Sequence, residues 1–599
     1  MSGSIADSSE ELTDYLSRAP EDDVIYFMLP DRFANGDLTN DTGGFGGDKF
    51  QHGFDPTHRG FYHGGDLKGL TAKLDYIKGL GATAIWLGPI YKNKPVQGPP
   101  GQQTSGYHGY WITDFTDVDP HLGTRADLKE FVNQAHARDI KVYLDIITNH
   151  TADVIKMREC HNPEISRDEW QWDCPYLTKA DYPYSTQGDV NGLEINPGFL
   201  GDADEHQTAE NFSKLVNANT AYRPYIPNGE ENSKTPAWLN DPIYYHNRGD
   251  SDWWGESSLY GDFSGLDDLM TEHPRVVDGF IEIFKYWITE YRMDGFRIDT
   301  AKHVNANFWR QFLPAMQAHA ASEGIPNFYM FGEVYDQNPA GLAKTTRVDG
   351  FEQSLDFAFQ DTVEKVMTEE SGTEIFDYFL MNDTLYNNGS ATARRLPVFL
   401  GNHDMGRFAG KLKAANPDIS QSELLERTKV AHAIMMFLRG VPVIYSGSEQ
   451  GFVSDGGDQL AREDMFHSMV AEYNDNNLIG TDKTTADENY DSDHPLYLTI
   501  AQLSEIRKAH PALSRGELKL RLSQRDGRVL GFSRFDPDND KEYVVVINTG
   551  ATTESVNVEI EYTSTRFETI LGSCPAMVRA NGVLSVELGA FGVNVCKAQ

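Results

Sequence analysis

Short apolar runs alternate with longer amphipathic stretches along most of the chain from residue 23 onward. The runs are typical of strands buried in a parallel sheet, and the stretches between them have the apolar spacing of helices that cover such a sheet. The pattern predicts strands at Val24–Leu29, Ala82–Leu87, Ile140–Ile146, Gly295–Ile298, Phe328–Phe331, Gly350–Leu355, Pro397–Leu400 and Val441–Tyr445. It predicts helices at Leu67–Lys78, Arg125–Ala137, Pro274–Tyr291 and Leu424–Leu438. Eight strand–helix units close a barrel, so we expect an α/β chain with a (β/α)8 TIM barrel.

The alternation is interrupted twice. Residues 151–263 are rich in Asn, Asp, Gly, Pro and aromatics without a helical period, and a structureless loop of that length is implausible in a compact domain. We therefore expect a small inserted domain after strand 3. Residues 452–494 are interpreted as long surface loops. After a helix at Leu498–His510 the pattern predicts an antiparallel β-sandwich, with strands at Val529–Phe535, Glu542–Asn548, Ser555–Tyr562 and Leu584–Val595.

These features divide the chain into three expected domains. The barrel comprises residues 1–150 and 264–511, the inserted domain residues 151–263, and the C-terminal β-sandwich residues 512–599.

The charge balance restricts the partners. Asp and Glu number 90 against 52 Lys and Arg, a formal charge of −38, which repels nucleic acid and anionic lipid and favours a neutral substrate. We expect no nucleic-acid partner, no membrane span and a monomer. The N-terminal residues 1–16 lack a basic region followed by an apolar stretch, so the chain as written has no signal peptide.

The four cysteines form two local couples, Cys160 with Cys174 and Cys574 with Cys596. Four cysteines allow three connectivities, and four free thiols are the alternative. The first couple lies in a polar, loop-rich region and the second near the ends of a β-domain. We expect both couples to be disulfides, which implies a secreted protein, extracellular or periplasmic.

Three predicted strands are followed by a carboxylate, namely Asp299, Glu333 and Asp404. Arg297 precedes the first by two residues and His403 stands beside the last. A charged group directly after an apolar strand is costly to hold unless it is paired or used. In a β/α barrel such strand ends converge at the C-terminal mouth, where catalytic residues lie. The pattern indicates an enzyme with a carboxylate active site.

Several segments resemble the hallmark motifs of the α-amylase family, glycoside hydrolase family 13. The order and spacing also match, and the resemblance covers the barrel from about residue 25 to residue 445. The segments are Asp145–His150, Gly295–His303, Phe331–Glu333 and Asn402–Asp404, with Tyr107–Trp111 and Gly440–Tyr445 as two further ones.

The resemblance implies a retaining glycosidase that cleaves α-1,4-glucosidic bonds in starch, glycogen-like glucans or malto-oligosaccharides. Asp299 is then the nucleophile, Glu333 the general acid/base, and Asp404 a third carboxylate that binds sugar hydroxyls. Retention requires two carboxyl groups about 5 Å apart. Arg297, on the same side of its strand as Asp299, is placed to hold the latter ionised.

The same resemblance implies further substrate-binding residues. His150 and His403 would donate hydrogen bonds to the sugar, Tyr110 would stack on it, and Asp145 would lie beneath as a structural carboxylate. The whole set is Tyr110, Trp111, His108, His150, Arg297, Lys302, His303, His403 and Asp145. The alternative is that these histidines are satisfied structural residues and that Tyr110 and Trp111 are core aromatics.

One or two Ca²⁺ sites are also implied by the resemblance. Asn149, Asp268 and the backbone carbonyl of His303 form the first set, and their hard oxygen ligands suit calcium. The second set consists of Asn35, Asp37, Asn40, Asp41, Gly64 and Asp66. Its alternative is a solvated turn, because Asn and Asp favour turns in any case.

The departures from the family narrow the function. Cyclodextrin-forming relatives carry an aromatic residue four positions before the aspartate that matches Asp268, where this chain has Ser264, and they continue with two more β-domains. Both differences favour hydrolysis. The alternatives are a glucanotransferase, an exo-acting malto-oligosaccharide-forming amylase, or an inactive glycan-binding barrel. We expect the inserted domain to form part of one cleft wall and to set the preferred chain length. Its tryptophans could instead build its own core; they are Trp170, Trp172, Trp238, Trp253 and Trp254.

Overall fold

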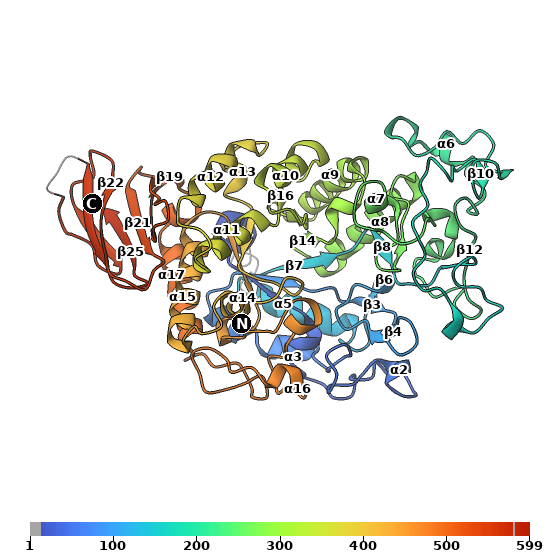
Figure 1. Ribbon diagram of the computed structural model, residues 1–599, viewed down its shortest axis with the longest axis horizontal. Helices are drawn as coiled ribbons and strands as arrows, with labels where there is room; N and C mark the ends of the chain where they lie inside the picture. Colours follow the sequence, from blue (N-terminus) through green and yellow to red (C-terminus); the bar gives the residue numbers. More distant parts are fainter. Residues whose placement is uncertain (1–13, 579–581) are drawn as a thin grey trace, which may run out of the picture.

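The computed structural model describes residues 14–578 and 582–599 and contains a parallel barrel (Figure 1). Its eight strands follow the spatial order β16-β15-β14-β7-β2-β1-β18-β17. The strands are β1 (Ile25–Met28), β2 (Ala84–Leu87), β7 (Lys141–Ile146), β14 (Gly295–Ile298), β15 (Tyr329–Gly332), β16 (Gln353–Ser354), β17 (Pro397–Phe399) and β18 (Val441–Tyr445). Strand pairing stops between β16 and β17, where Asp356 N donates to Pro397 O at 2.9 Å. The barrel predicted from the apolar runs is confirmed.

Helices surround the barrel because each presents an apolar stripe to the strands. The longer ones are α5 (Arg125–His136), α8 (Pro274–Tyr291), α9 (Ala306–Ser322), α11 (Phe357–Met367), α15 (Gln421–Phe437) and α17 (Pro495–Ala509). The shorter ones include α3 (Leu67–Ala72), α4 (Leu74–Gly79), α10 (Pro339–Lys344), α12 (Ile375–Met381) and α14 (Phe408–Ala415). Helix α8 begins at the capping side chain of His273, has Pro274 in its first turn and ends at Arg292, which is left-handed. This stop sends the chain directly into β14, the strand that carries Arg297.

The C-terminal residues form an antiparallel β-domain. One sheet follows the order β19-β20-β21-β25-β23 and β22 pairs with β24, with apolar side chains of both sheets packed between them. The strands are β19 (Glu517–Leu522), β20 (Val529–Phe535), β21 (Glu542–Asn548), β22 (Glu554–Glu559), β23 (Phe567–Leu571), β24 (Val583–Leu588) and β25 (Val593–Ala598). The single strand predicted at Leu584–Val595 is wrong. A turn at 589–592 divides it, and β24 and β25 join different sheets.

Two buried arginines lie where this β-domain meets the barrel, and Arg534 joins the two. Arg534 of β20 donates to the carbonyls of Phe437, Leu438, Ser514 and Gly516, and Arg507 of α17 donates to the carbonyl of Met436 at 2.6 Å. Three of these carbonyls lie at the C-terminal end of α15. The last carbonyls of a helix have no N–H partner within the helix and carry a partial negative charge. The two guanidinium groups satisfy that helix end.

The segment 151–263 leaves the barrel after β7 and lies at the opposite end of the molecule from the terminal β-domain (Figure 1). It contains short elements only. They are β8 (His150–Thr151), β9 (Lys156–Met157), β10 (Thr186–Gln187), β11 (Leu193–Glu194), β12 (Pro224–Tyr225), α6 (Ala209–Phe212) and α7 (Ser257–Tyr260). The domain boundaries at 150/151, 263/264 and 511/512 stay predictions.

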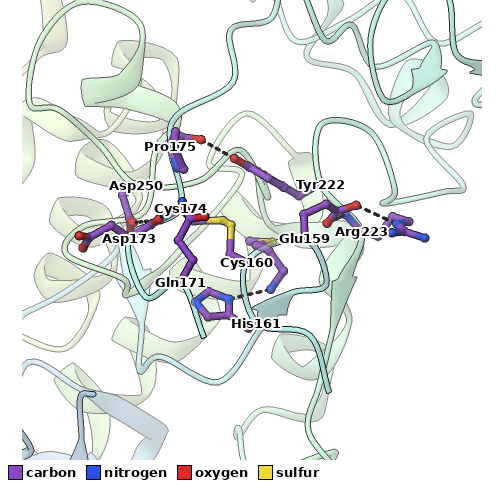
Figure 2. The surroundings of a disulfide bond; sticks show 11 residues. Glu159, Cys160, His161, Gln171, Asp173, Cys174, Pro175, Tyr222, Arg223 and Asp250 are labelled. Atoms are coloured by element: carbon purple, nitrogen blue, oxygen red, sulfur yellow. Dashed lines mark hydrogen bonds and ion pairs between the residues drawn. A yellow bond between two sulfur atoms is a disulfide. The ribbon is translucent and has the colours of Figure 1, made fainter. Parts of the chain in front are cut away.

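Both expected disulfides are present, Cys160–Cys174 and Cys574–Cys596. The first closes a loop of the segment 151–263 beside Tyr222 and Asp250 (Figure 2). The expectation of surface loops over residues 452–494 is wrong for part of them. Arg462, Glu463 and Asp464 are buried because they pair with other polar groups at the barrel mouth.

Among residues 14–578 and 582–599 there is no helix long and apolar enough to cross a membrane. The interpretation of the first 16 residues as lacking a signal peptide falls mostly on residues 1–13, outside the described residues.

Candidate active site

Arg297 organises the carboxylates at the C-terminal mouth of the barrel. Its Nη1 atom lies 2.8 Å from Asp145 Oδ1 and 2.8 Å from Asp299 Oδ1, and its Nη2 atom lies 3.0 Å from Glu333 Oε2. The three acids come from β7, β14 and β15, which are neighbours in the barrel. Since one planar guanidinium contacts Asp299 and Glu333, these two carboxyl groups face a common space, as two cooperating acids must.

The backbone between these acids is strained. Thr300, directly after the first, has φ of 48°, a left-handed conformation that β-branched residues rarely adopt. Its N–H donates to Glu333 Oε2 at 3.0 Å. Strain of this kind persists where the surroundings enforce it, and it is common at functional sites. Here it turns one backbone donor toward the second carboxyl group.

Asp404 lines the same pocket as Glu333 and has a different arginine partner. Arg462 Nη2 donates to Asp404 Oδ1 at 3.0 Å, while its Nε donates to the carbonyl of His403. Sequence reasoning missed Arg462 because it lies in an irregular segment that has no period to place it. The sequence feature that could have indicated Arg462 is its spacing of four residues from Asp458. The two form an ion pair, with 2.5 Å between Arg462 Nη2 and Asp458 Oδ1.

Tyr110 and Asp145 contact the groups that surround the three predicted catalytic acids, Asp299, Glu333 and Asp404. The Tyr110 hydroxyl lies 3.1 Å from Asp145 Oδ2 and 2.8 Å from His403 Nε2. Asp145 is fully buried and also accepts from Trp86 Nε1 at 3.0 Å. Gly109, at φ of 88°, makes the turn before Tyr110, and a Cβ there would lie 2.2 Å from the Pro89 carbonyl. Both carboxylate oxygens of Asp145 thus accept hydrogen bonds from protein donors, as expected of a structural carboxylate.

The other residues predicted to bind substrate lie around the acids and differ in their hydrogen-bond partners. His150 is buried and its Nε2 has no hydrogen-bond partner among the described residues. Burial lowers the pKa of His150 and of His403 to about 3, so both rings are neutral near pH 7. His108 accepts from Tyr110 N at 3.1 Å and packs edge-on against Trp111. Its role is therefore positional in this structure.

Lys302 and His303 have hydrogen-bond partners other than the three acids. The Lys302 side chain is exposed and its Nζ donates to the carbonyl of Tyr335 at 3.4 Å. The His303 ring is buried, and its Nδ1 lies 2.8 Å from the Ser258 carbonyl. Neither contacts the three acids through a hydrogen bond.

Phe263 is a second residue that sequence reasoning missed. Its ring stacks on His150 with centroids 5.5 Å apart and meets His303 edge-on at 5.5 Å. Position 264 is not aromatic, but the preceding residue, Phe263, supplies an aromatic ring to the site. A pocket of about 310 Å³ lies against Glu333 and Asp404. Its other walls include Tyr335, Asn402 and Met405. The arrangement leaves space over the carboxyl groups for a bound molecule.

The pKa values of the acids predict a bell-shaped pH profile for any reaction that needs one protonated and one ionised carboxyl group. Burial raises the pKa of Glu333 to about 7, with Arg297 opposing it, and burial raises the pKa of Asp299 to about 6, again against Arg297. The proton on Glu333 is lost as the pH rises through its pKa, and the charge on Asp299 is lost as the pH falls through its pKa. We expect kcat/KM to be highest between about pH 6 and pH 7 and to fall on both sides.

Measured initial rates across pH 4–9 test this profile. An acid limb near the ordinary aspartate value of about 4 would contradict the assignment of a buried, desolvated nucleophile. Desolvation also raises the pKa of Asp404, but His403, Arg462 and Arg297 outweigh it and the net shift is downward. Asp404 therefore stays ionised through this range.

The first predicted calcium set is partly assembled. Strand β13 (Asp267–Asp268) pairs with β8, so Asp268 lies opposite His150, and Leu269 N donates to the Asn149 carbonyl at 2.9 Å. One Asp268 oxygen is 2.5 Å from His246 Nδ1. The other oxygen, the Asn149 amide and the His303 carbonyl are hard donors that suit Ca²⁺. His246 competes with an ion for one of the Asp268 oxygens.

The second predicted set gathers in one turn. Gly64 lies against Asn35 and Asp41, since a Cβ at Gly64 would approach Asn35 Nδ2 to 2.5 Å and Asp41 Oδ1 to 2.7 Å. Asn40 Oδ1 is buried without a hydrogen-bond partner, which a cation would supply. Asp66 accepts from backbone N–H groups and caps α3. This set also fits a cation.

Asp37 of the second set is engaged elsewhere, because it pairs with Lys68 at 2.5 Å. Over residues 14–578 and 582–599, no three His, Cys, Asp or Glu side chains are grouped to hold a metal ion. Amide and backbone oxygens must therefore contribute at either site.

Comparison with known proteins agrees with this geometry. The family model described as alpha amylase, catalytic domain, matches residues 27–516. An α-amylase of Streptomyces lividans is 45% identical over 509 residues, which are 85% of this chain and 53% of that protein. The chain thus spans about half the length of this relative.

Two solved structures cover nearly the whole chain. An Anoxybacillus α-amylase has a TM-score of 0.67 and 26% identity and covers 97% of this chain and 99% of its own. A cyclomaltodextrin glucanotransferase with a three-domain ABC distribution has a TM-score of 0.68 and 27% identity, covering 96% and 99%. With the barrel, the acids at its C-terminal mouth and these matches in agreement, the chain belongs to the α-amylase family.

Proposed function

We propose that this protein is a retaining glycosidase that hydrolyses α-1,4-glucosidic bonds in starch, glycogen-like glucans or malto-oligosaccharides. The observation that carries the proposal is the contact of Arg297 with both Asp299 and Glu333 beside an open pocket. Double displacement at a sugar requires two neighbouring acids, one ionised and one protonated, and the contact with Arg297 brings these two together.

In the first step, Glu333 gives its proton to the glycosidic oxygen while an Asp299 carboxylate oxygen bonds to the anomeric carbon. The C–O bond to the leaving sugar breaks, and a glucosyl ester on Asp299 remains. Thr300 N–H and Arg297 hold the Glu333 carboxyl group in place for this transfer.

In the second step, Glu333 takes a proton from water, and the water oxygen bonds to the anomeric carbon. The ester bond breaks, Asp299 becomes a carboxylate again and Glu333 is reprotonated. Asp404, kept ionised by Arg462, stabilises the positive charge that develops on the sugar ring in both steps. His150 Nε2 has no protein partner and is available to a sugar hydroxyl.

The product mixture tests the proposal. The protein is incubated with amylose, pullulan and maltoheptaose, and the products are separated and their first-formed anomer is recorded. Release of shorter α-anomers supports retaining hydrolysis of 1,4-bonds. Products of the β-anomer would contradict the two-step mechanism.

The second candidate is a glucanotransferase, favoured by Phe263, which stands against His150 where a glucan would cross the centre. Longer or cyclic products from maltoheptaose would select it, and a single short product would select exo-action. An inactive glycan-binding barrel would release no products. The presence of Asp299, Glu333 and Asp404 in one site argues against that alternative.

Calcium is part of the proposal at one or both sets. Asn149, Asp268 and the His303 carbonyl would hold an ion that ties the segment 151–263 to the barrel. The turn of Asn35, Asn40, Asp41 and Asp66 would hold another. Neither ion enters the chemical steps, because their role would be to fix loops around the cleft.

A chelator is therefore expected to lower the melting midpoint, and added Ca²⁺ should restore it, since a ligand that binds only the folded state stabilises it by mass action. Elemental analysis of the purified protein provides the stoichiometry. An unchanged midpoint together with a metal-free analysis would refute both sites.

The two disulfides support the proposal of a secreted protein, because such bonds persist in oxidising compartments. We further propose that the protein is a monomer with an α-glucan as its partner. Light scattering during gel filtration measures the oligomeric state directly.

A further inference from the structure

A second pocket lies beside the catalytic centre, between the barrel and the segment 151–263. It has a volume of about 500 Å³, within the range of ligand-binding sites. Trp111, Trp172 and Trp253 line it, together with Asp153 and Asp250. We call it the tryptophan pocket.

The tryptophan pocket is continuous with the residues that surround the catalytic acids. Trp111 follows Tyr110, whose hydroxyl bonds to Asp145 and His403. On the other side, Trp253 meets Phe263 edge-on with centroids 4.4 Å apart, and Phe263 stacks on His150. These ring contacts connect the walls of the pocket to residues that surround the catalytic acids.

Trp253 is held in an unusual backbone conformation. Its φ is 71°, which is a true outlier for a bulky side chain, and its N–H donates to Ser251 Oγ at 3.0 Å. The residue is nevertheless 41% exposed, so the burial of its ring does not offset the free-energy cost of the strained backbone. An exposed aromatic ring kept in a strained position is a feature of binding sites rather than of cores.

Trp172 is braced from three directions. Its Nε1 donates to the Arg167 carbonyl at 3.2 Å, its ring packs against His161, and the Lys156 ammonium lies 5.2 Å from its centre. Two residues later, Cys174 closes the disulfide with Cys160, and its N–H donates to Asp250 Oδ2 at 2.6 Å (Figure 2). The disulfide thereby fixes the segment that carries Trp172, and the hydrogen bond to Asp250 ties this segment to the loop that carries Trp253.

The chemistry of the walls selects the occupant. Rigid indole rings offer flat apolar faces to the C–H face of a pyranose, and carboxylates accept strong hydrogen bonds from hydroxyl groups. The lysine of this lining, Lys156, is paired with Asp153, and the other aspartates, on a chain of formal charge −38, repel phosphates and other anions. In the described part of the chain no group of three acidic or histidine side chains is arranged for a metal ion. A neutral polyhydroxylated chain suits these walls.

We propose that the tryptophan pocket is an anchoring subsite for a long α-glucan, and that Trp172 and Trp253 determine the preferred chain length by binding sugar units remote from the cleaved bond. This inference rests on the proposed function and deepens it. The other tryptophans of the segment 151–263 do not line the pocket, although Trp170 packs against Trp172 with ring centroids 5.3 Å apart. Trp238 packs against the barrel core, and Trp254 is 81% exposed outside the pocket lining.

The test compares a long with a short substrate in the full-length protein. Trp253→Ala and, separately, Trp172→Ala should lower kcat/KM for maltoheptaose about tenfold more than for 4-nitrophenyl α-maltoside, as expected when one aromatic anchor is removed. The maltoheptaose product pattern should change at the same time. Trp254→Ala is the matched control, and its ratio of the two values should stay within about twofold of the unmodified protein.

Binding separates this inference from the proposed function. In a Glu333→Gln background, calorimetry with maltoheptaose should show a dissociation constant about tenfold higher after Trp253→Ala but not after Trp254→Ala. Trp253→Phe keeps a ring against Phe263, so its dissociation constant should fall between those of the two alanine variants. Such a value shows that the weaker binding of Trp253→Ala is not caused by a folding defect. Equal losses for long and short substrates, or equal effects of the two alanine variants, would overturn the pocket assignment. A protein that binds maltoheptaose through Trp253 but hydrolyses neither substrate would refute the hydrolase alone.

Discussion

Glu333→Gln is expected to lower turnover of maltoheptaose by about three orders of magnitude, the range of general acid–base catalysis. The amide fits the same space and can still contact Arg297 and Thr300 N–H, but it has no proton to give to the leaving oxygen. Steady-state rates on maltoheptaose measure the loss. A maltosyl fluoride substrate separates the steps, because fluoride leaves without a proton and formation of the ester on Asp299 should be far less affected.

Glu364→Gln is the matched control for this variant. Glu364 lines the same pocket as Glu333, but its carboxylate pairs with Lys411 at 2.6 Å and does not contact Arg297. Its replacement should change turnover by less than about tenfold. Near-normal turnover in Glu333→Gln, or a comparable loss in Glu364→Gln, would show that Glu333 is not the acid.

Asp299→Asn should abolish turnover more completely, by on the order of 10⁴-fold or more, as removal of a catalytic nucleophile does. An amide oxygen carries no charge and forms no stable ester with the anomeric carbon. In contrast to Glu333→Gln, the fluoride substrate should not restore the rate, because the missing group is the attacking one.

Mass spectrometry checks the same variant independently. A slow fluorinated glucosyl substrate should add one sugar mass to the unmodified protein, on the peptide containing Asp299, and none to Asp299→Asn. An unfolding midpoint close to that of the unmodified protein excludes a folding defect. A labelled Asp299→Asn protein would show that another residue is the nucleophile.

The barrel and its acids were predictable because they follow local rules. Strand β14 was predicted at its observed bounds, since an apolar run after a helix stop at Arg292 leaves few alternatives. The carboxylates at strand ends were visible for the same reason, because polar residues stand out directly after buried strands. That Asp299 and Glu333 lie at one mouth of the barrel was an expectation from barrel topology, and their contact with the same arginine agrees with it.

The missed residues depend on long-range contacts. Arg462 lies in a segment without regular structure, and only the approach of that segment to Asp404 gives it a partner. Phe263 reaches His150 through the path of the loop before β13, which hydrophobic periodicity does not encode. The division between β24 and β25 also escaped prediction, because apolar alternation continues on both sides of the turn.

The arginine contacts at the end of α15 have a consequence for shortened versions of the protein. The family match ends at residue 516, whereas Arg534, which donates to the last carbonyls of that helix, lies beyond it. Truncation at the apparent catalytic boundary would therefore remove the donor to the carbonyls of Phe437 and Leu438, leave Arg507 on Met436, and expose this end of a barrel helix to solvent. The terminal β-domain is in this sense a structural part of the catalytic unit. A shortened version of the protein should therefore end after β25 rather than before β19.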